Sequence, residues 1–393
     1  MIRLNISNAQ DIKRIKTLLE ENQWLNKSHK IEKNDGVFHI YTTLETIPQV
    51  LSHTQWDRYD LEEKSVQSLT AARDNYCSEN NVAYFDVPKR WTAYPPMLLL
   101  SANTDDTLPS EFCKYLLRHY QAVFGNKGIT HVALNRPIVE SDILRRPTNL
   151  VPVYGDFGPD IGVNESPTEE DFNQAFWCSA VQNGILQTWA PRYTMFSRGN
   201  IKEKKRILDN YPRLKGTIVF DFYCGIGYFS LSYLQNGAKV LCWELNPWSI
   251  EGFRRSLEHG GYKYKIYHTN EPFVIDDVAK YDACIFLESN EVIPSRLEQA
   301  RDNSMNISHI NLGLLPTSKP SWSIANNLIA KKSMSNLPTL VHVHENVHVD
   351  DFDNMKNEIE SKYDNSRVIH IEKVKTFAPD VWHAVFDVVI EHE

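Results

Sequence analysis

Two glycines and two carboxylates in the C-terminal half of the sequence have the types and order of a nucleoside site. An apolar stretch ends at Asp221 and runs into Gly225 and Gly227 before a helical pattern begins. Glycines at a strand-to-helix turn let the backbone approach a ligand that a β-carbon would exclude. The next apolar stretch ends at Glu244, where a carboxylate can accept both hydroxyl protons of a ribose. We therefore expect a nucleoside to bind at this turn.

The turn differs from a dinucleotide fingerprint at one position. Ser230 stands where the third glycine would be, and that glycine belongs to the pyrophosphate cradle of NAD and FAD sites. The motif therefore favours a nucleoside without a phosphate. An aspartate, two glycines and a strand-end glutamate in this order are the pattern of S-adenosylmethionine (SAM) enzymes with a Rossmann-like sheet. The alternative is a structural turn beside a solvated Glu244.

The elements around the turn alternate between strand and helix. Apolar strand candidates after Asn200 are residues 217–222, 239–243, 283–287, 309–314, 339–343, 368–372 and 384–390. Helices fit between most of them, which is typical of βαβ units and a largely parallel sheet. The last two strands have no helix between them, so we expect an antiparallel pair. The predicted fold class is α/β, with a C-terminal Rossmann-like class I SAM-dependent methyltransferase sheet and smaller α+β N-terminal and middle domains.

The sequence upstream divides into two parts. In residues 1–95 a helix capped by Ser7 or Asn8 precedes a strand at 37–41, which indicates an N-terminal α/β domain. Polar stretches near 75–81 and 103–107 suggest loops, so we place the boundary near residue 95. Residues 96–195 contain several strand patterns and the hairpin dipeptide Asn183-Gly184, and we expect a middle α+β domain there. Residues 196–393 then form the SAM-binding catalytic domain.

Composition and charge exclude several classes of protein. The 393 residues are 42% hydrophobic and 23% charged, which is typical of a globular chain. The net charge of −8 argues against a protein that coats nucleic acid with its whole surface. We find no apolar run long enough for a membrane span and no secretory signal. The six cysteines lack paired spacing, so we expect reduced thiols and a cytoplasmic protein without membrane contact.

A basic segment precedes the glycine turn. Between Leu186 and Lys215 eight basic residues stand against two acidic ones, a local balance of +6. These side chains can contact RNA phosphates, although a charge run alone is more often a solvated helix face. The candidates for RNA contact are Arg192, Arg198, Lys202, Lys205 and Arg206.

A histidine cluster offers a competing kind of site. His342 and His344 alternate along a strand and would share a face, where they could chelate a metal. No cysteine and no clear third ligand apart from Glu345 is fixed nearby. We therefore predict no metal site and expect a buried or edge-strand histidine pair.

Four segments in order along the sequence resemble one family. They are Met195–Asn200, Glu244–Gly252, Asn311–Ser318 and Val374–Pro379. Over about residues 170–393 the sequence is similar to the tRNA wybutosine-synthesizing enzymes that transfer a 3-amino-3-carboxypropyl group from SAM. Related tRNA guanine-N1 methyltransferases have Asn-Leu-Pro in the third segment and Ser-Pro-Arg-Leu in the first. This sequence has Asn-Leu-Gly-Leu-Leu-Pro and Ser-Arg-Gly-Asn, and both departures favour the aminocarboxypropyl branch.

The resemblance implies a set of site residues. In the family a serine and a lysine seven positions apart contact SAM, and Ser197 and Lys204 keep that spacing. The strand-end acid corresponds to Glu244, and the pair on the adenine side falls at Asn270 and Glu271. The expected SAM contacts are Ser197, Lys204, Asp221, Gly225, Gly227, Glu244, Asn270 and Glu271. The expected acceptor-side contacts are Asn311 and Pro316, together with the five basic residues named above.

The resemblance also implies a reaction. The aminocarboxypropyl group of SAM would move to the side-chain carbon of 4-demethylwyosine, next to the anticodon of tRNA-Phe, and methylthioadenosine would leave. The anticodon stem-loop would contact the middle domain, and we expect no obligate protein partner. Because the sulfonium is already activated, placement supplies much of the rate, and we identify no catalytic base. Two alternatives stay open, a SAM-dependent tRNA guanine-N1 methyltransferase and a non-catalytic RNA-binding protein with a Rossmann shell.

Overall fold

A computed structural model of the chain describes most of its residues. These are residues 1–26, 29, 31–34, 36–59, 68–101, 107–119, 128–136, 142, 146–147, 149–162, 166–298, 305–333 and 338–391. The chain divides into two compact units, Met1–Gln67 and Ser68–Glu393. Among the described residues, every helix is too short or too polar to cross a lipid bilayer.

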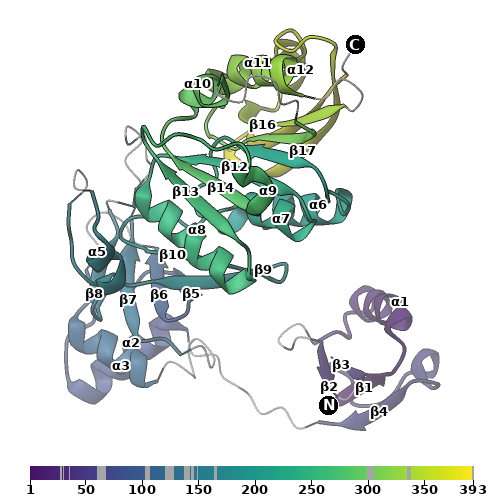
Figure 1. Cartoon of the computed structure of the whole chain (residues 1–393). Helices are drawn as coiled ribbons and strands as arrows, with labels where there is room; N and C mark the ends of the chain where they lie inside the picture. The colour runs from purple at the N-terminus through teal and green to yellow at the C-terminus, as the bar shows by residue number, and fades with distance from the viewer. Residues whose placement is uncertain are drawn as a thin grey trace. The chain divides into compact units, whose positions relative to one another are not determined.

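The first unit is a small antiparallel sheet with one α-helix packed on it (Figure 1). Its strands lie in the order β2-β3-β1-β4, and Asn8 caps α1 by accepting a hydrogen bond from the backbone N–H of Gln10. Ile15 and Leu19 of α1 are buried against the inner face of β1. The elements are β1 (Ile2–Ile6), α1 (Ala9–Glu21), β2 (Glu32–Asn34), β3 (Val37–Tyr41), η1 (Gln49–Leu51) and β4 (Gln55–Arg58).

The sequence-based boundary near residue 95 falls inside a hairpin of the second unit. Strands β5 (Arg90–Tyr94) and β6 (Met97–Ser101) pair antiparallel, with Tyr94 opposite Met97. The polar stretch that suggested a loop at 75–80 belongs to helix α2 (Leu69–Asn80), whose buried residues include Ala72 and Tyr76. Its polar side chains form the solvent face of a helix, which composition alone does not distinguish from a loop.

The middle part of the chain is a four-stranded sheet followed by a hairpin. The sheet has the order β5-β6-β7-β8. Helix α2 packs in its core through Ala72 and Tyr76, and α3 through Phe112 and Leu116. In the hairpin, Asn183 and Gly184 have φ angles of 53° and 81°, which confirms the predicted turn. The remaining elements are α3 (Ser110–Arg118), β7 (His131–Asn135), β8 (Val151–Tyr154), α5 (Glu169–Gln174), β9 (Cys178–Gln182) and β10 (Ile185–Trp189).

The C-terminal part of the second unit is an eight-stranded sheet in the order β13-β14-β12-β11-β15-β16-β18-β17. The pairs from β13 to β16 are parallel, and β18 pairs antiparallel with both β16 and β17. This confirms the predicted parallel sheet with a final antiparallel pair. Its strands are β11 (Ile218–Asp221), β12 (Lys239–Glu244), β13 (Tyr264–His268), β14 (Ala283–Leu287), β15 (Ile307–Leu312), β16 (Thr339–His348), β17 (Ser366–Ala378) and β18 (Val381–Ile390).

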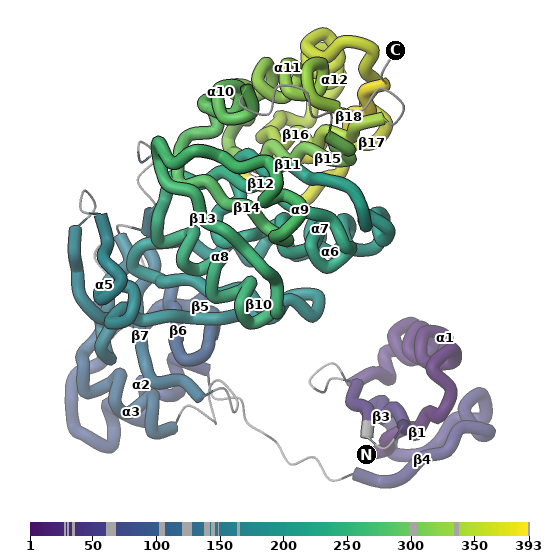
Figure 2. The backbone as a smooth tube through the Cα atoms, in the orientation of Figure 1, coloured from purple at the N-terminus to yellow at the C-terminus, as the bar shows by residue number. Residues whose placement is uncertain are grey.

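Helices cover both faces of this sheet (Figures 1 and 2). Phe220 and Trp243 face a core shared with α10, α11 and α12, whereas Val219 and Cys242 face a core shared with α6, α7 and α8. Buried on both faces, the strands are nearly continuous apolar runs, as expected for a parallel sheet. The helical elements are η2 (Arg198–Asn200), α6 (Ile201–Asn210), α7 (Ser230–Gln235), α8 (Pro247–Gly260), α9 (Asp277–Lys280), η3 (Asn290–Val292), α10 (Ile293–Glu298), η4 (Lys319–Ser321), α11 (Trp322–Lys332) and α12 (Phe352–Glu360).

Candidate active site

Asp221 is the last residue of β11, and its side chain stabilises the glycine turn. Its buried carboxylate accepts hydrogen bonds from Ser230 Oγ at 2.6 Å and from Asn311 Nδ2 at 3.0 Å. Burial raises the pKa of Asp221, and these hydrogen bonds oppose the rise. Asn311 is fully buried, so the structure corrects its expected role as an acceptor-side contact. The serine in place of the third glycine is used here to hold Asp221.

The glycine turn and Glu244 form one hydrogen-bonded unit. Glu244 Oε2 accepts from the backbone N–H of Gly225 at 2.9 Å, and Oε1 accepts from that of Asn246 at 2.8 Å. Gly227 has a φ of 79°, and a β-carbon there would lie 2.4 Å from the Phe253 ring. Burial raises the pKa of Glu244, while the backbone donors oppose the rise. Each carboxylate oxygen keeps a lone pair for a ribose hydroxyl, because a carboxylate oxygen can accept two hydrogen bonds.

Lys204 is an ammonium buried among amides and aromatic rings. It is only 3% exposed, and its Nζ donates to Gln182 Oε1 at 2.8 Å and to Gln187 Oε1. The rings of Phe196 and Tyr228 lie 5.2 and 5.0 Å away. In the described part of the chain no acid forms an ion pair with it. Burial, with a contribution from the nearby Lys375, lowers the pKa of Lys204 to about 7.

Ser197 stands beside this lysine at the start of η2. Its backbone N–H donates to Tyr228 Oη at 3.3 Å, and its Oγ accepts from Lys375 Nζ at 3.3 Å. The structure thus brings Ser197, Lys204 and the glycine turn together, as the sequence predicts. It adds Gln182, Gln187 and Lys375, for which the sequence carried no signal except that Lys375 lies in the fourth family-like segment.

The expected adenine pair follows β13, which β14 separates from the strand that ends at Glu244. The sheet places β14 between β12 and β13, so Leu287 of β14 is the register partner of Glu244, and His268 of β13 pairs beyond it. Adjacent strands are about 4.8 Å apart. Glu271 also forms an ion pair with Lys265 at 3.4 Å. Asn270 and Glu271 therefore lie beyond β14, and the residues that follow β14 are nearer to the strand that ends at Glu244.

Among the residues that follow β14, Asn290 lies next to the nucleoside turn. It lies at the start of η3, is buried, and its Nδ2 donates to the carbonyl of Phe222 at 2.9 Å. Phe222 directly follows Asp221, so Asn290 borders the nucleoside turn. The neighbouring Glu288 is held by Arg296, with atoms 2.6 and 2.5 Å apart. An amide at this edge can hydrogen-bond a purine.

Comparison with known proteins identifies the family. The chain is 41% identical to "tRNA wybutosine-synthesizing protein 2" of Schizosaccharomyces pombe, over 77% of this chain and 73% of that protein. It is 36% identical to the protein of the same name in Saccharomyces cerevisiae, over 77% of this chain and 74% of that protein. The chain belongs to the tRNA wybutosine-synthesizing protein 2 family. No family model matches the chain.

Solved structures support the fold of this wybutosine-synthesizing family member. A complex of aTrm5 with tRNALeu superposes with a TM-score of 0.54 at 16% identity, covering all of both chains. A Pyrococcus horikoshii TYW2 structure in complex with MeSAdo gives a TM-score of 0.51 at 19% identity, covering 82% of this chain and 99% of that one. The predicted Rossmann-like class I methyltransferase fold is confirmed.

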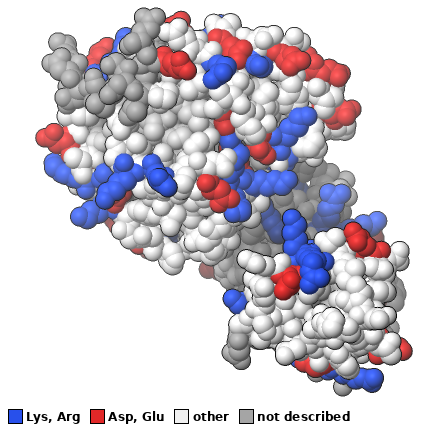
Figure 3. All heavy atoms as spheres, turned by 90° about the vertical axis from the view of Figure 1, so that its right-hand side faces the viewer, with Lys and Arg blue, Asp and Glu red and all other residues white. Residues whose placement is uncertain are grey.

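The basic segment of this family member is only partly available for RNA. Arg206 has a side chain only 9% exposed, because it forms ion pairs with Glu203 and Asp387 inside the protein. The structure therefore corrects its expected role as a phosphate contact. Lys205 is exposed but pairs with Asp209 at 2.8 Å. On the face in Figure 3, basic side chains form small groups with acidic ones between them.

The other members of the basic segment differ in exposure. Arg198 is exposed in η2, and Lys202 is exposed in the first turn of α6. Arg192 forms an ion pair with Asp160 at 3.2 Å. Pro316, in the third family-like segment, is exposed as well. The exposure of Arg198, Lys202 and Pro316 is compatible with the contact to a macromolecular substrate that was expected from the sequence.

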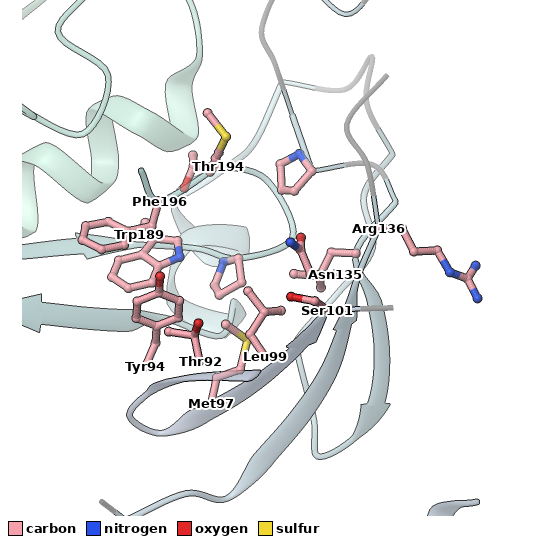
Figure 4. A pocket seen from close by; sticks show the side chains of 14 residues that line it. Thr92, Tyr94, Met97, Leu99, Ser101, Asn135, Arg136, Trp189, Thr194 and Phe196 are labelled. Carbon is pink, nitrogen blue, oxygen red and sulfur yellow. The ribbon is translucent and has the colours of Figure 1, made fainter. Parts of the chain in front are cut away.

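A cavity of about 450 Å³ opens beside the Ser197 loop of this family member (Figure 4). The rings of Trp189 and Phe196 stack at 4.2 Å, and Tyr94 stands edge-on to both. Figure 4 shows Thr92, Ser101 and Asn135 around the same space, while the side chain of Arg136 points away from it. The backbone carbonyl of Met195, in the cavity wall, accepts a hydrogen bond from Tyr228 Oη, which links the cavity to the nucleoside site.

The histidine cluster forms a buried hydrogen-bond network. His342 Nδ1 lies 2.7 Å from Asp387 Oδ1, and its Nε2 lies 2.9 Å from His309 Nδ1. His344 Nδ1 lies 3.0 Å from His383 Nε2. Burial is the main reason that the pKa of His383 falls to about 3. In the described residues, this family member has no group of three potential metal ligands.

Proposed function

We propose that the protein transfers the 3-amino-3-carboxypropyl group of SAM to the side-chain carbon of 4-demethylwyosine next to the anticodon of tRNA-Phe. The observation that carries the proposal is family membership, at 41% and 36% identity over most of the length of both relatives. Such a protein is a SAM-dependent transferase with tRNA as its substrate. This disfavours the hypothesis of a non-catalytic RNA-binding protein.

The donor site is supported by the order of polar groups along the sheet edge. Glu244 offers two carboxylate oxygens to a ribose, and Asn290 borders the turn on the adenine side. Lys204 lies at the opposite end of the site, beside Ser197 and Tyr228. A buried ammonium without an acid partner favours a carboxylate ligand, and SAM carries one on its amino-acid tail.

The reaction depends more on how the donor and the acceptor are placed than on activation of either one, because the sulfonium is already activated. In a transfer from a sulfonium, the acceptor carbon forms a bond to the γ-carbon as the carbon–sulfur bond breaks, and the electron pair stays on sulfur. The acceptor gives up a proton, and methylthioadenosine is the second product. The protein selects the reacting carbon by fixing the tail, because the carbon that faces the acceptor in line is the one that reacts.

The cavity of Figure 4 is the proposed site of the acceptor base. Its stacked Trp189 and Phe196 provide an aromatic wall, and a fused base of an unpaired loop nucleotide binds proteins mainly by such contacts. Thr92, Ser101 and Asn135 provide hydrogen-bonding groups in the same space. The cavity adjoins the Ser197 loop, where the amino-acid tail of the donor would lie.

The experiment that tests the function identifies the sulfur product. The protein is incubated with SAM and tRNA-Phe that carries 4-demethylwyosine, and the products are separated by chromatography with mass detection. Methylthioadenosine together with a heavier base is expected. S-adenosylhomocysteine with a methylated base would contradict the proposal and favour the tRNA guanine-N1 methyltransferase alternative.

A further inference from the structure

Gln187 of β10 is a buried amide that connects two parts of the donor site. It is only 1% exposed. Its Oε1 accepts a hydrogen bond from Lys204 Nζ, and its Nε2 donates to the carbonyl of Gly227 at 3.3 Å. Gly227 belongs to the glycine turn, whereas Lys204 lies on α6. The position of the ammonium is therefore set from the nucleoside turn as well as from its own helix.

Gln182 of β9 makes a second connection to the same ammonium. Its Oε1 accepts from Lys204 Nζ at 2.8 Å, and its Nε2 donates to the carbonyl of Arg198 at 3.5 Å. The hairpin pairs Gln182 with Ile185, and Gln187 is two positions further along β10. Because side chains alternate across a strand, both glutamines lie on one face of the hairpin. Lys204 is thus held by two amides, one bonded to η2 and one bonded to the glycine turn.

Both hydrogen-bond partners of this ammonium are neutral. Two other largely buried cations, Arg206 and Arg296, form ion pairs with carboxylates, which is the usual arrangement for a buried charge. An amide oxygen stabilises an ammonium by a hydrogen bond but leaves its positive charge in place. The charge of Lys204 can then attract an anion that enters the site, and SAM has a carboxylate on its amino-acid tail.

We propose that Gln187 is a positioning residue whose neutral amide holds Lys204 beside the glycine turn and leaves its charge for the carboxylate of the SAM tail. The proposal rests on the proposed function, because it concerns the same donor. Gln187 acts through Lys204 and determines the preference for a donor with a carboxylate. Gln187→Glu keeps nearly the size of the side chain but places a carboxylate against the ammonium, so it should remove this preference.

Three ligands that share the nucleoside test this role. Isothermal titration calorimetry measures the binding of SAM, of decarboxylated SAM and of methylthioadenosine to the full-length protein. SAM and decarboxylated SAM both carry the sulfonium and the amino group, so the ratio of their affinities reports on the carboxylate. Gln187→Glu should lower this ratio by about tenfold or more, the effect of losing one charge-assisted hydrogen bond. The affinity for methylthioadenosine should stay within about twofold of the original protein.

The pH dependence of SAM binding gives a second measurement, which a purely structural role of Gln187 would not change. A carboxylate introduced by Gln187→Glu raises the pKa of the adjacent ammonium. The fall of SAM affinity should therefore begin at a higher pH than in the original protein. The other charged or titratable groups around Lys204 are Lys375 of β17, Tyr228 of the glycine turn and the ion pair of Glu203 and Arg206 on its own helix.

Two further variants complete the test. Gln235→Glu is the matched control, because it makes the same chemical change at an exposed residue of α7, and it should bind all three ligands as the original protein does. Gln182→Glu places a carboxylate against Lys204 from the other strand of the hairpin. It should lower the ratio in the same direction, and it serves as the test if Gln187→Glu does not fold. Thermal unfolding of each variant monitors its fold.

Two outcomes would overturn the proposal. If Gln187→Glu weakened the binding of all three ligands equally, the amide would only support the glycine turn. If the folded glutamate variants kept the original ratio and pH profile, the charge of Lys204 would not act on the carboxylate. Failure of the proposed reaction is seen separately, because S-adenosylhomocysteine formed by the original protein would leave the calorimetric result intact.

Discussion

At the scale of single residues, the donor site is a row of hydrogen-bonding groups whose partners differ along the ligand. In the proposed complex with SAM, Glu244 contacts the ribose, Asn290 the adenine and Lys204 the amino-acid tail. Each contact can therefore be removed by a substitution. Its effect is measured as the affinity for ligands that contain or lack the part of SAM that the residue contacts. The predictions for these residues use this division.

Loss of Asn290 tests the adenine side. Asn290→Ala should weaken SAM and methylthioadenosine by the same factor, about five- to tenfold, because both ligands contain the adenine and one neutral hydrogen bond is worth about 1 kcal/mol. Glu271→Ala, at the position predicted from the sequence, should leave both affinities unchanged. The measurement is calorimetric titration. If Glu271→Ala weakened binding and Asn290→Ala did not, the adenine contact would be assigned to the residues that follow β13.

Loss of Glu244 tests the ribose side. Glu244→Ala removes two hydrogen bonds to a charged acceptor, each worth about 1.5–3 kcal/mol, so SAM binding should fall by at least a hundredfold. Methylthioadenosine should lose a similar factor, because it has the same ribose. Glu244→Gln, which keeps one carbonyl acceptor, should bind with intermediate affinity. Unchanged binding in Glu244→Ala would remove this residue from the site.

The lowered pKa of Lys204 predicts that donor binding depends on pH. Its pKa without ligand is about 7, and the protonated form binds a carboxylate. Protonation is complete below that pH and is lost as the pH rises through it, so SAM affinity should be constant near about pH 6 and fall up to tenfold per unit above pH 7. Calorimetry in buffers of different ionisation enthalpy should detect proton uptake at about pH 8. Affinity that rose with pH would contradict this assignment.

At the scale of elements, α6 is fixed to the C-terminal sheet by a buried ion pair. Arg206 bridges Glu203 of the same helix and Asp387 of β18, and Asp387 continues the contact to His342 of β16. Because Lys204 is on the same helix, this bridge also sets where its ammonium lies. The bridge therefore positions the site without contacting a ligand.

Removal of the bridge should mainly affect stability. Arg206→Ala leaves Glu203 and Asp387 buried without their cation, which costs about 3–5 kcal/mol in the free energy of unfolding. Lys205→Ala removes only an exposed pair with Asp209, worth less than about 1 kcal/mol. Urea unfolding followed by circular dichroism compares the two. A stable Arg206→Ala protein with weakened tRNA binding would support a phosphate contact instead.

At the scale of the whole molecule, the exposed cations near α6 are expected to guide the tRNA. Lys202 is exposed and precedes the buried Glu203 and Lys204 on the same helix. Each phosphate contact that is lost reduces the slope of log affinity against log salt by about one. Lys202→Ala should therefore weaken tRNA binding and reduce its salt dependence, while SAM affinity stays constant. A lower SAM affinity with unchanged tRNA binding would contradict this role.

The local part of the site could be predicted from the sequence. The strand, the glycine turn and the following helix around Gly225 are encoded by neighbouring residues, and Glu244 follows at the end of the next strand. The Asn183-Gly184 turn is equally local, since its positive φ angles depend on those two residues. These features need no knowledge of which segments meet in space.

Contacts between distant segments were decided only by the tertiary structure. Whether β13 or β14 lies beside β12 depends on how the connecting helices pack on the sheet, so the adenine side could not be assigned from strand patterns. The burial of Arg206 depends on Asp387, and the place of Lys375 depends on Ser197 and Gly199. The spacing of residues in the sequence does not reveal such partners. A side chain's burial and charge pairing are set by segments from elsewhere in the chain that pack against it.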